Sequence, residues 1–216
     1  MKALYFLGLM GLLLVNCTPR PAKQNTFADF FPTLSSQDTL VFAVEAGAGT
    51  EASLASADTI ATDTFYRYVP DSLRASIAHI LDGGDPVIVA LGRFDLDAQY
   101  EGLGVDIKAF WFRNQSLLVF DKQQQQVVGL LPIAEFYGGD GGQILRASWL
   151  IAAPDKEKML LMRESQHALR IDENTQEMND TYAEAVARYV WQNGRFAEQS
   201  VADSTALIQA FPVKWE

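Results

Sequence analysis

The spacing of apolar residues along the chain changes near Asp85. Before this point, apolar residues recur every three or four positions within 70–84, as on one face of an α-helix. After it, short apolar or alternating runs follow one another, separated by short polar or glycine-containing links. We therefore expect an amphipathic helix first and a series of β-strands after it.

The segment 70–84 carries helix signals at its ends as well as in its middle. Asp71 or Ser72 can cap the first amides, and Gly83 can end the helix in a left-handed conformation. The apolar face consists of Leu73, Ile77, Ile80 and Leu81. At about 100° per residue His79 lies away from this face, so we expect it to face solvent or a neighbouring loop.

Strand-like runs occur on both sides of this helical segment. We expect a buried strand at 39–47, followed by a loop at 47–59 that has few bulky apolar residues. In the second half of the chain, the links at 113–116 and 122–126 are short and polar. Short links favour antiparallel pairing between consecutive strands, as in a meander.

The strongest turn signal lies near the carboxyl end, at Asn193 and Gly194. Both residue types accept the positive φ that a type I′ hairpin requires, and strand-like runs flank them. The alanines within 180–188 fit a helix as well as a strand, and we favour a strand. The closing segment 204–216 is expected to dock as a short helix or strand.

These patterns together predict the fold class. The chain has 216 residues, 49% of them apolar, which is enough material for one hydrophobic core. We expect a mainly β fold, with α+β as the alternative, built as an antiparallel β-meander or sandwich-like sheet with one or two peripheral helices. A single β-rich domain should span 27–216.

The amino-terminal segment has the composition of a secretory signal. Lys2 is followed by an uncharged apolar run from Ala3 to Val15. As a helix this run would be about 20 Å long, whereas the hydrocarbon core of a bilayer is roughly 30 Å thick. The run is therefore too short to span a membrane comfortably.

This segment ends in four residues that resemble the lipobox of bacterial lipoprotein signals, Leu14, Val15, Asn16 and Cys17. The resemblance implies a signal peptide at 1–16, a lipidated amino terminus and tether at 17–26, and a diacylglycerol thioether on Cys17. Thr18, where inner-membrane lipoproteins carry aspartate, implies the outer membrane instead. The alternative is an ordinary Cys17 in a short anchor or an uncleaved leader.

Charge and cysteine content exclude several classes of protein. The chain has 27 acidic and 17 basic residues, a net charge of -10, and its basic residues are scattered, which excludes nucleic-acid binding. Cys17 is the only cysteine, so no internal disulfide or cysteine zinc site can form. With only two histidines and no GxSxG motif, the sequence predicts no catalytic triad, metal site or cofactor.

Two stretches contain candidate ligand-binding residues. The glycine-rich segment 135–143 includes Tyr137 and Asp140, and it lacks a phosphate-loop motif, so a tight turn between strands is favoured. Asp95 and Asp97 offer oxygens of the kind that calcium prefers, but their spacing does not match a calcium-binding loop. We assign these four residues to a hypothetical ligand-binding surface.

The expected function is that of a lipid-anchored envelope protein, a non-catalytic binding or scaffolding module whose partner is an envelope protein or a glycan. One alternative is an envelope hydrolase that acts on glycan or peptidoglycan through carboxylates such as Asp95, Asp97 and Asp140. Another is a calcium-stabilised adhesion domain.

Replacing Cys17 with alanine is expected to release the protein from the membrane fraction, because the substitution removes the thiol that would carry the acyl chains. Cell fractionation combined with metabolic labelling by an alkyne fatty acid measures both effects. Thr18→Ser keeps the thiol and serves as the control, with neither result changed. Undiminished labelling and membrane association of Cys17→Ala would contradict lipidation.

Overall fold

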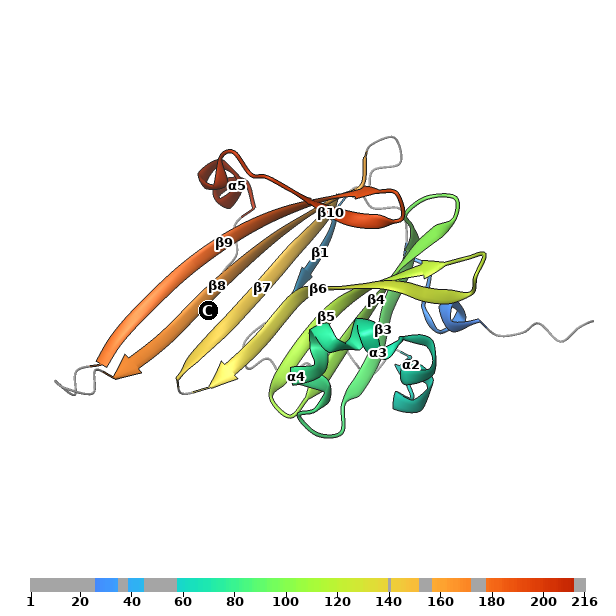
Figure 1. Cartoon of the computed structure of the whole chain (residues 1–216), viewed down its shortest axis with the longest axis horizontal. Coiled ribbons are helices and arrows are strands. Elements are labelled where there is room, and N and C mark those ends of the chain that lie inside the picture. The colour runs from blue at the N-terminus through green and yellow to red at the C-terminus, as the bar shows by residue number, and fades with distance from the viewer. Residues whose placement is uncertain are drawn as a thin grey trace, which may run out of the picture.

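The fold is dominated by one antiparallel sheet (Figure 1). A computed structural model describes residues 26–34, 39–44, 58–139, 141–151, 157–171 and 178–211. Of these residues, 60% lie in strands and 18% in helices, which confirms a mainly β fold. The strands are β1 (Thr39–Ala43), β2 (Thr59–Ile60), β3 (Val87–Asp95), β4 (Tyr100–Ala109), β5 (Phe112–Asp121), β6 (Gln126–Gly139), β7 (Gly142–Ile151), β8 (Met159–Ile171), β9 (Met178–Gln192) and β10 (Arg195–Gln199).

The sheet has the predicted meander topology. From β2 to β10 the strands lie across the sheet in the order of the sequence, and each pair is antiparallel. The long strands β8 and β9 run side by side and extend beyond the ends of β6 and β7 (Figure 1). Short turns impose this order, because a strand that ends in a tight turn can pair only with its successor.

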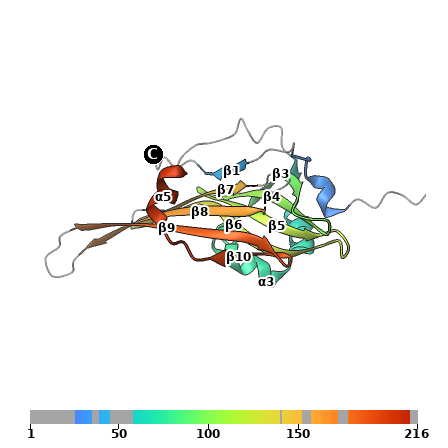
Figure 2. The ribbon, with the colours of Figure 1, turned by 90° about the horizontal axis from the view of Figure 1, so that it is seen from above.

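Helices lie on both sides of the sheet. Seen from above, α5 lies on one side and α3 on the other (Figure 2). None of the described helices is both long enough and apolar enough to cross a bilayer. The helices are η1 (Phe27–Phe30), α2 (Thr62–Tyr68), α3 (Asp71–Arg74), η2 (Ala75–Ile77), α4 (Ala78–Leu81) and α5 (Ser204–Ala210).

The sheet divides at the middle of β7. The first half of β7 pairs with β6 and the second half with β1 on the same edge, while β8 occupies the other edge along the whole strand. β6 therefore leaves β7 after the pair formed by Glu135 and Arg146. Where the strands diverge, the buried Ser148 hydroxyl donates to the Ile133 carbonyl oxygen at 2.5 Å and keeps them together.

Two clusters of apolar side chains hold the layers together. The first packs the helices against β3, β4 and β5, and the second packs β5 and β6 against β1, β7 and β8. Complete burial of one such side chain contributes about 1.5–3 kcal/mol. Central members are Phe65, Ile80 and Ile107 in the first cluster and Phe42, Leu117, Ile133, Leu150 and Leu160 in the second.

The carboxyl-terminal elements agree with the sequence patterns. Asn193 and Gly194 have φ values of 52° and 76° and connect β9 to β10, as the type I′ turn signal predicts. The segment 180–188 lies within β9, so the preference for a strand is confirmed. The closing segment forms the helix α5, and residues 212–216 lie outside the described ranges.

The turn predicted at 113–116 is wrong. These residues lie within β5, and the chain turns instead at Phe110 and Trp111, whose exposed fractions are 67% and 57%. Two of these polar residues contact each other inside the strand, although the buried Asn114 Nδ2 atom has no hydrogen-bond partner among the described residues. The buried Ser116 hydroxyl donates to the Oδ1 atom of the buried Asn114 at 2.6 Å.

The expectation of a fully buried strand at 39–47 is also wrong. Only 39–43 form a strand within the described residues, and Val41 is 61% exposed while Phe42 is buried. β1 pairs with β7 alone, so it lies at an edge of the sheet. The alternation of exposed Val41 and buried Phe42 shows that only one face of β1 is covered. Most of the loop expected at 47–59 falls outside the described residues, and its last residue, Thr59, belongs to β2.

Replacing Gly194 with alanine is expected to lower the free energy of unfolding by about 1–2 kcal/mol, because its φ of 76° strains any residue with a Cβ atom. Such a Cβ would also lie 3.0 Å from the Tyr100 hydroxyl. Gly139→Ala is the control, since its Cβ would meet no atom within 4 Å. Urea unfolding measures both variants, and equal stability of the two would contradict the strained turn.

Candidate functional site

A cavity of about 490 Å³ lies where the helical segment approaches the diverging strands. Residues of η2 and α4 line one side of it, and residues of β6, β7, β8 and β9 line the rest. The cavity therefore lies beside the point where β6 and β7 separate. Its polar and aromatic lining residues are Ser76, His79, Glu135, Tyr137, Arg146 and Tyr189.

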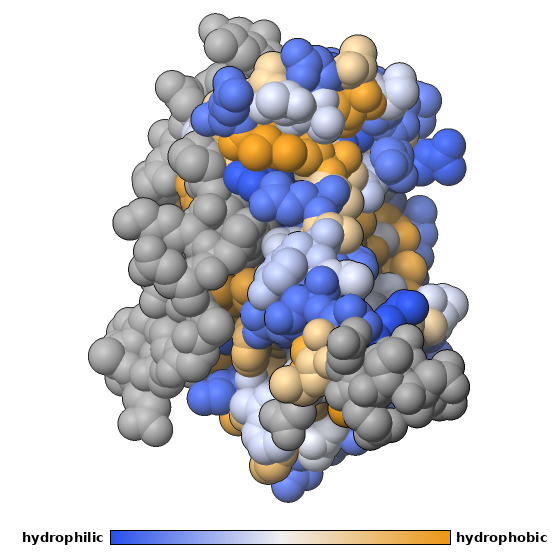
Figure 3. Space-filling view, turned by 90° about the vertical axis from the view of Figure 1, so that its left-hand side faces the viewer, coloured by the Kyte–Doolittle hydropathy of each residue, from blue (hydrophilic) through white to orange (hydrophobic). Residues whose placement is uncertain are grey.

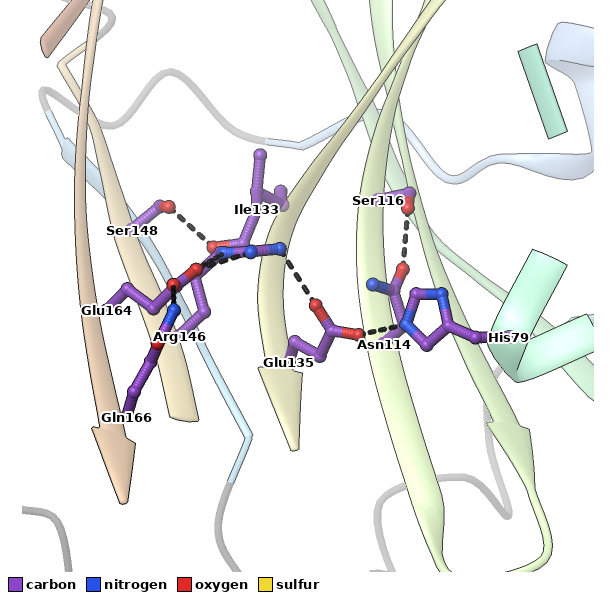
Figure 4. A network of polar contacts seen from close by, with 9 residues as sticks. All are labelled: His79, Asn114, Ser116, Ile133, Glu135, Arg146, Ser148, Glu164 and Gln166. Carbon is purple, nitrogen blue, oxygen red and sulfur yellow. Dashed lines mark hydrogen bonds and ion pairs between the residues drawn. The ribbon is translucent and has the colours of Figure 1, made fainter. Parts of the chain in front are cut away.

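An ion-pair network crosses three neighbouring strands at this cavity (Figure 4). Glu135, Arg146 and Glu164 lie directly opposite one another in the registers of β6, β7 and β8, so their side chains emerge from the same face. Arg146 Nη1 donates to Glu135 Oε2 at 2.8 Å, and its Nε donates to Glu164 Oε2 at 2.9 Å. One guanidinium thus binds both carboxylates.

His79 extends this network from the helical side. Its Nε2 lies 2.5 Å from Glu135 Oε1, and its ring packs edge-on against Tyr137 with centroids 4.8 Å apart. His79 is partly exposed to solvent, as expected, with 37% of its side chain accessible, but it also contacts a carboxylate of β6, which the sequence does not predict. The segment 71–81 is not one α-helix, and the 3₁₀ turn η2 changes the rotation per residue just before His79. The predicted apolar stripe is nevertheless retained, with Ile77 and Ile80 fully buried.

Because Glu135 is buried, its carboxylate requires the partners that this network provides. Glu135 is only 4% exposed, and its two carboxylate oxygens are taken up by Arg146 and His79. A buried carboxylate without such partners would cost several kcal/mol. On the far side, Gln166 Nε2 donates to Glu164 Oε1 at 2.6 Å, so the second carboxylate is oriented as well.

Two tyrosines and several apolar residues complete the cavity. Burial raises the pKa of Tyr189, and the carboxylates of Glu198 and Glu164 raise it further against the opposing charge of Arg146. The Tyr189 phenol therefore keeps its proton at neutral pH and can donate a hydrogen bond. Tyr137 stacks on Phe112, with ring centroids 4.5 Å apart. The apolar lining is formed by Leu131, Pro132, Ile144 and Met162.

Of the four candidate ligand-binding residues, the structure places Tyr137 in this cavity. Asp95 is the last residue of β3 and Asp97 lies in the turn that follows, and neither lines the cavity. The Asp95 carboxylate forms an exposed ion pair with Lys122 at 3.1 Å. Asp140 and the lipidation candidate Cys17 lie outside the described residues.

Asp97 has a structural role in its turn. Its Oδ1 accepts hydrogen bonds from the backbone amides of Gln99 and Tyr100 at 2.8 and 2.9 Å, and its Oδ2 accepts from the Trp191 indole at 2.8 Å. Partial burial acts to raise the pKa of Asp97, but these hydrogen bonds and the charge of Lys122 outweigh it, so the pKa is lowered. The carboxylate ties the β3–β4 turn to β9.

The described part of the chain contains no group of three or more His, Cys, Asp or Glu side chains that could hold a metal ion. Within this described part, the buried carboxylate of Asp106 binds an arginine and no metal-ligating group: Arg113 Nε donates to Asp106 Oδ1 at 2.9 Å.

Most of the site was not found from the sequence. Glu135, Arg146 and Glu164 come from three different strands, and only their register brings them together. One local signal was available, because Arg146 is a lone charge within an apolar run from Ile144 to Ile151. A charged residue in a buried strand requires a counter-charge from a neighbouring strand.

Comparison with known proteins identifies no relative of this chain. No protein-family model matches it, and no curated protein or solved structure is significantly similar to it.

The variant Asp97→Asn is expected to be less stable than the parent protein at pH 7 by about 0.5–1 kcal/mol, a value reduced by solvent screening at this exposed turn. Because the folded-state pKa of Asp97 is lowered, its stabilising contribution is present above pH 4 or so and is lost as the pH falls through the folded value. Urea unfolding at pH 7 and at about pH 3 measures the difference.

Trp191→Phe provides the comparison for this experiment, since it removes one donor and leaves the carboxylate in place. It should retain part of the pH dependence attributed to Asp97. A stability difference between Asp97→Asn and the parent that is the same at both pH values would contradict this role.

Proposed function

We propose that this protein is a lipid-anchored component of a bacterial envelope, and that its β-rich domain is a non-catalytic binding module for a glycan. The attachment rests on the lipobox-like residues that end in Cys17 and on the proline-containing segment that follows them. Thr18 favours the outer membrane. The binding role rests on the cavity beside the division of the sheet.

The observation that carries the proposal is the fixed polar network at the cavity. Its charged side chains already hold one another in place, so little conformational entropy is lost when a ligand binds. The cavity is lined by Glu135, which accepts hydrogen bonds, and by Arg146 and Tyr189, which donate them. Sugar hydroxyl groups both donate and accept, and therefore match such a mixed lining.

The aromatic and charge properties of the cavity point in the same direction. Tyr137, which lies beside His79 and Phe112, adds aromatic surface to the lining, and aromatic side chains suit the apolar faces of sugars. The Arg146 guanidinium compensates one of the two carboxylate charges, so the site carries no surplus of positive charge that would attract a polyanion. A largely neutral glycan suits this balance better than a polyanion does.

The same geometry disfavours hydrolysis at this cavity. Glycoside hydrolases place two carboxyl groups roughly 5–9.5 Å apart on opposite sides of the bond that is cleaved. Here the Arg146 guanidinium lies between Glu135 and Glu164 and occupies that space.

A direct binding experiment tests the proposal. The full chain in lipid nanodiscs is titrated calorimetrically with envelope glycans and soluble peptidoglycan fragments, and the mixtures are analysed for cleavage products. We expect binding without cleavage. Cleavage would support the hydrolase alternative, and no binding to any glycan would contradict the proposed ligand class.

His79→Ala is expected to weaken glycan binding about tenfold, which corresponds to roughly 1.4 kcal/mol, because it releases one oxygen of Glu135 and removes the contact with Tyr137. His167→Ala is the matched control. This second histidine pairs with Asp180 and stacks on Tyr182, away from the cavity, so its removal should leave binding unchanged. Equal affinities of the two variants would place the glycan elsewhere.

A further inference from the structure

A second cavity lies on the opposite face of the two strands that border the first one. It has a volume of about 480 Å³ and is enclosed by β8, β9, the segment 200–203 and α5. Side chains alternate between the faces of a strand, so Leu161 and Arg188, a directly opposed pair, point into this cavity. Their neighbours Met162 and Tyr189 line the first cavity.

The lining of this second cavity is mostly apolar. It is formed by side chains such as Met159, Leu161, Val201, Ala206 and Leu207. On the side of the molecule that carries α5, apolar atoms also reach the surface in a band near the height of this helix (Figure 3). The cavity therefore offers a surface for a hydrocarbon chain.

One cation interrupts this apolar lining. The Nε atom of Arg188 is buried, and no group in the described ranges accepts a hydrogen bond from it. A guanidinium remains charged in proteins, and buried charged groups are normally paired or hydrogen-bonded. The unpaired Nε therefore indicates that an acceptor from outside the described structure completes this site.

The two described residues nearest to this role are engaged elsewhere. Asp203 also lines the cavity, but its Oδ1 accepts from the amide of Ala206 and caps α5. Arg163, on the same face of β8, donates to the carbonyl oxygen of Phe211 at 2.8 Å and to Glu184 at 2.9 Å. Arg163 thus holds α5 over the strands, whereas Arg188 faces the space beneath it.

We propose that this cavity binds a fatty acid, with its carboxylate on the Arg188 guanidinium and its hydrocarbon chain along Leu161, Val201 and Leu207. A guanidinium binds a carboxylate through two parallel N–H donors, and the unpartnered Nε of Arg188 can supply one of them. The volume lies within the range of roughly 300–1,000 Å³ that is usual for small-molecule sites. This site is separate from the proposed glycan site, because the sheet lies between them.

Photo-crosslinking tests this proposal with the full chain in lipid nanodiscs. The probe is a 12-carbon fatty acid with a diazirine near its methyl end, and labelled peptides are mapped by mass spectrometry. We expect labelling of β8 and of the segment from Val201 to Leu207. Unlabelled dodecanoate should compete at concentrations about tenfold lower than 1-dodecanol, since a charged hydrogen bond contributes that factor or more.

Arg188→Met keeps an apolar stem of similar length and should reduce the apparent affinity for the probe about tenfold while leaving competition by 1-dodecanol unchanged. Ala206 lines the cavity from an exposed position on α5, so Ala206→Phe should leave folding unchanged. The larger side chain should fill the cavity and abolish labelling. Gln209→Phe, on the same helix but outside the lining, is its control and should label normally.

Labelling of Arg188→Met at the level of the parent protein, or equal competition by dodecanoate and 1-dodecanol, would overturn the proposal. Labelling confined to segments away from α5 and β8 would do the same. Glycan binding by the Arg188→Met variant is expected to be normal, so failure here is distinguishable from failure of the glycan proposal.

Discussion

The structure depends most on the pairing of Arg146 with Glu135 and Glu164 across β6, β7 and β8. β6 pairs with only the first half of β7, and the Glu135–Arg146 pair is the last before the two strands separate. Without Arg146 the buried Glu135 would keep only the contact with His79, at a cost of about 3–5 kcal/mol. This ion pair therefore stabilises the point where the sheet divides, and through Glu135 and His79 it connects the helical segment to the sheet.

The division of the sheet has consequences for both packing and function. β1 takes the place of β6 beside the second half of β7, and the apolar cluster around Ile133, Leu150 and Leu160 fills the space between the separated strands. The cavity lined by Tyr137 and Tyr189 lies at this boundary. In a continuous flat sheet, β6 would pair with β7 along the whole length of β7, which would leave no room for the cavity.

The two faces of β8 and β9 differ in how they satisfy their charges. On one face Arg146 is held by two carboxylates, which fixes the shape of a polar cavity before any ligand arrives. On the other face Arg188 has a buried nitrogen for which the described residues provide no acceptor, within an apolar lining. A rigid polar surface suits a ligand rich in hydroxyl groups, whereas an unpaired guanidinium suits an amphiphilic anion. One pair of strands can therefore serve two unrelated ligands.

The sequence by itself determined the features that depend on neighbouring residues. The helical stripe, the turn at Asn193 and Gly194 and the meander order all follow from local spacing and backbone preference. The turn at Phe110 was missed because Asn114 and Ser116 are polar residues that lie buried inside β5, where the Ser116 hydroxyl donates to Asn114. Only the tertiary structure decided the candidate sites, since strand register and the 3₁₀ turn before His79 bring together residues far apart in the chain.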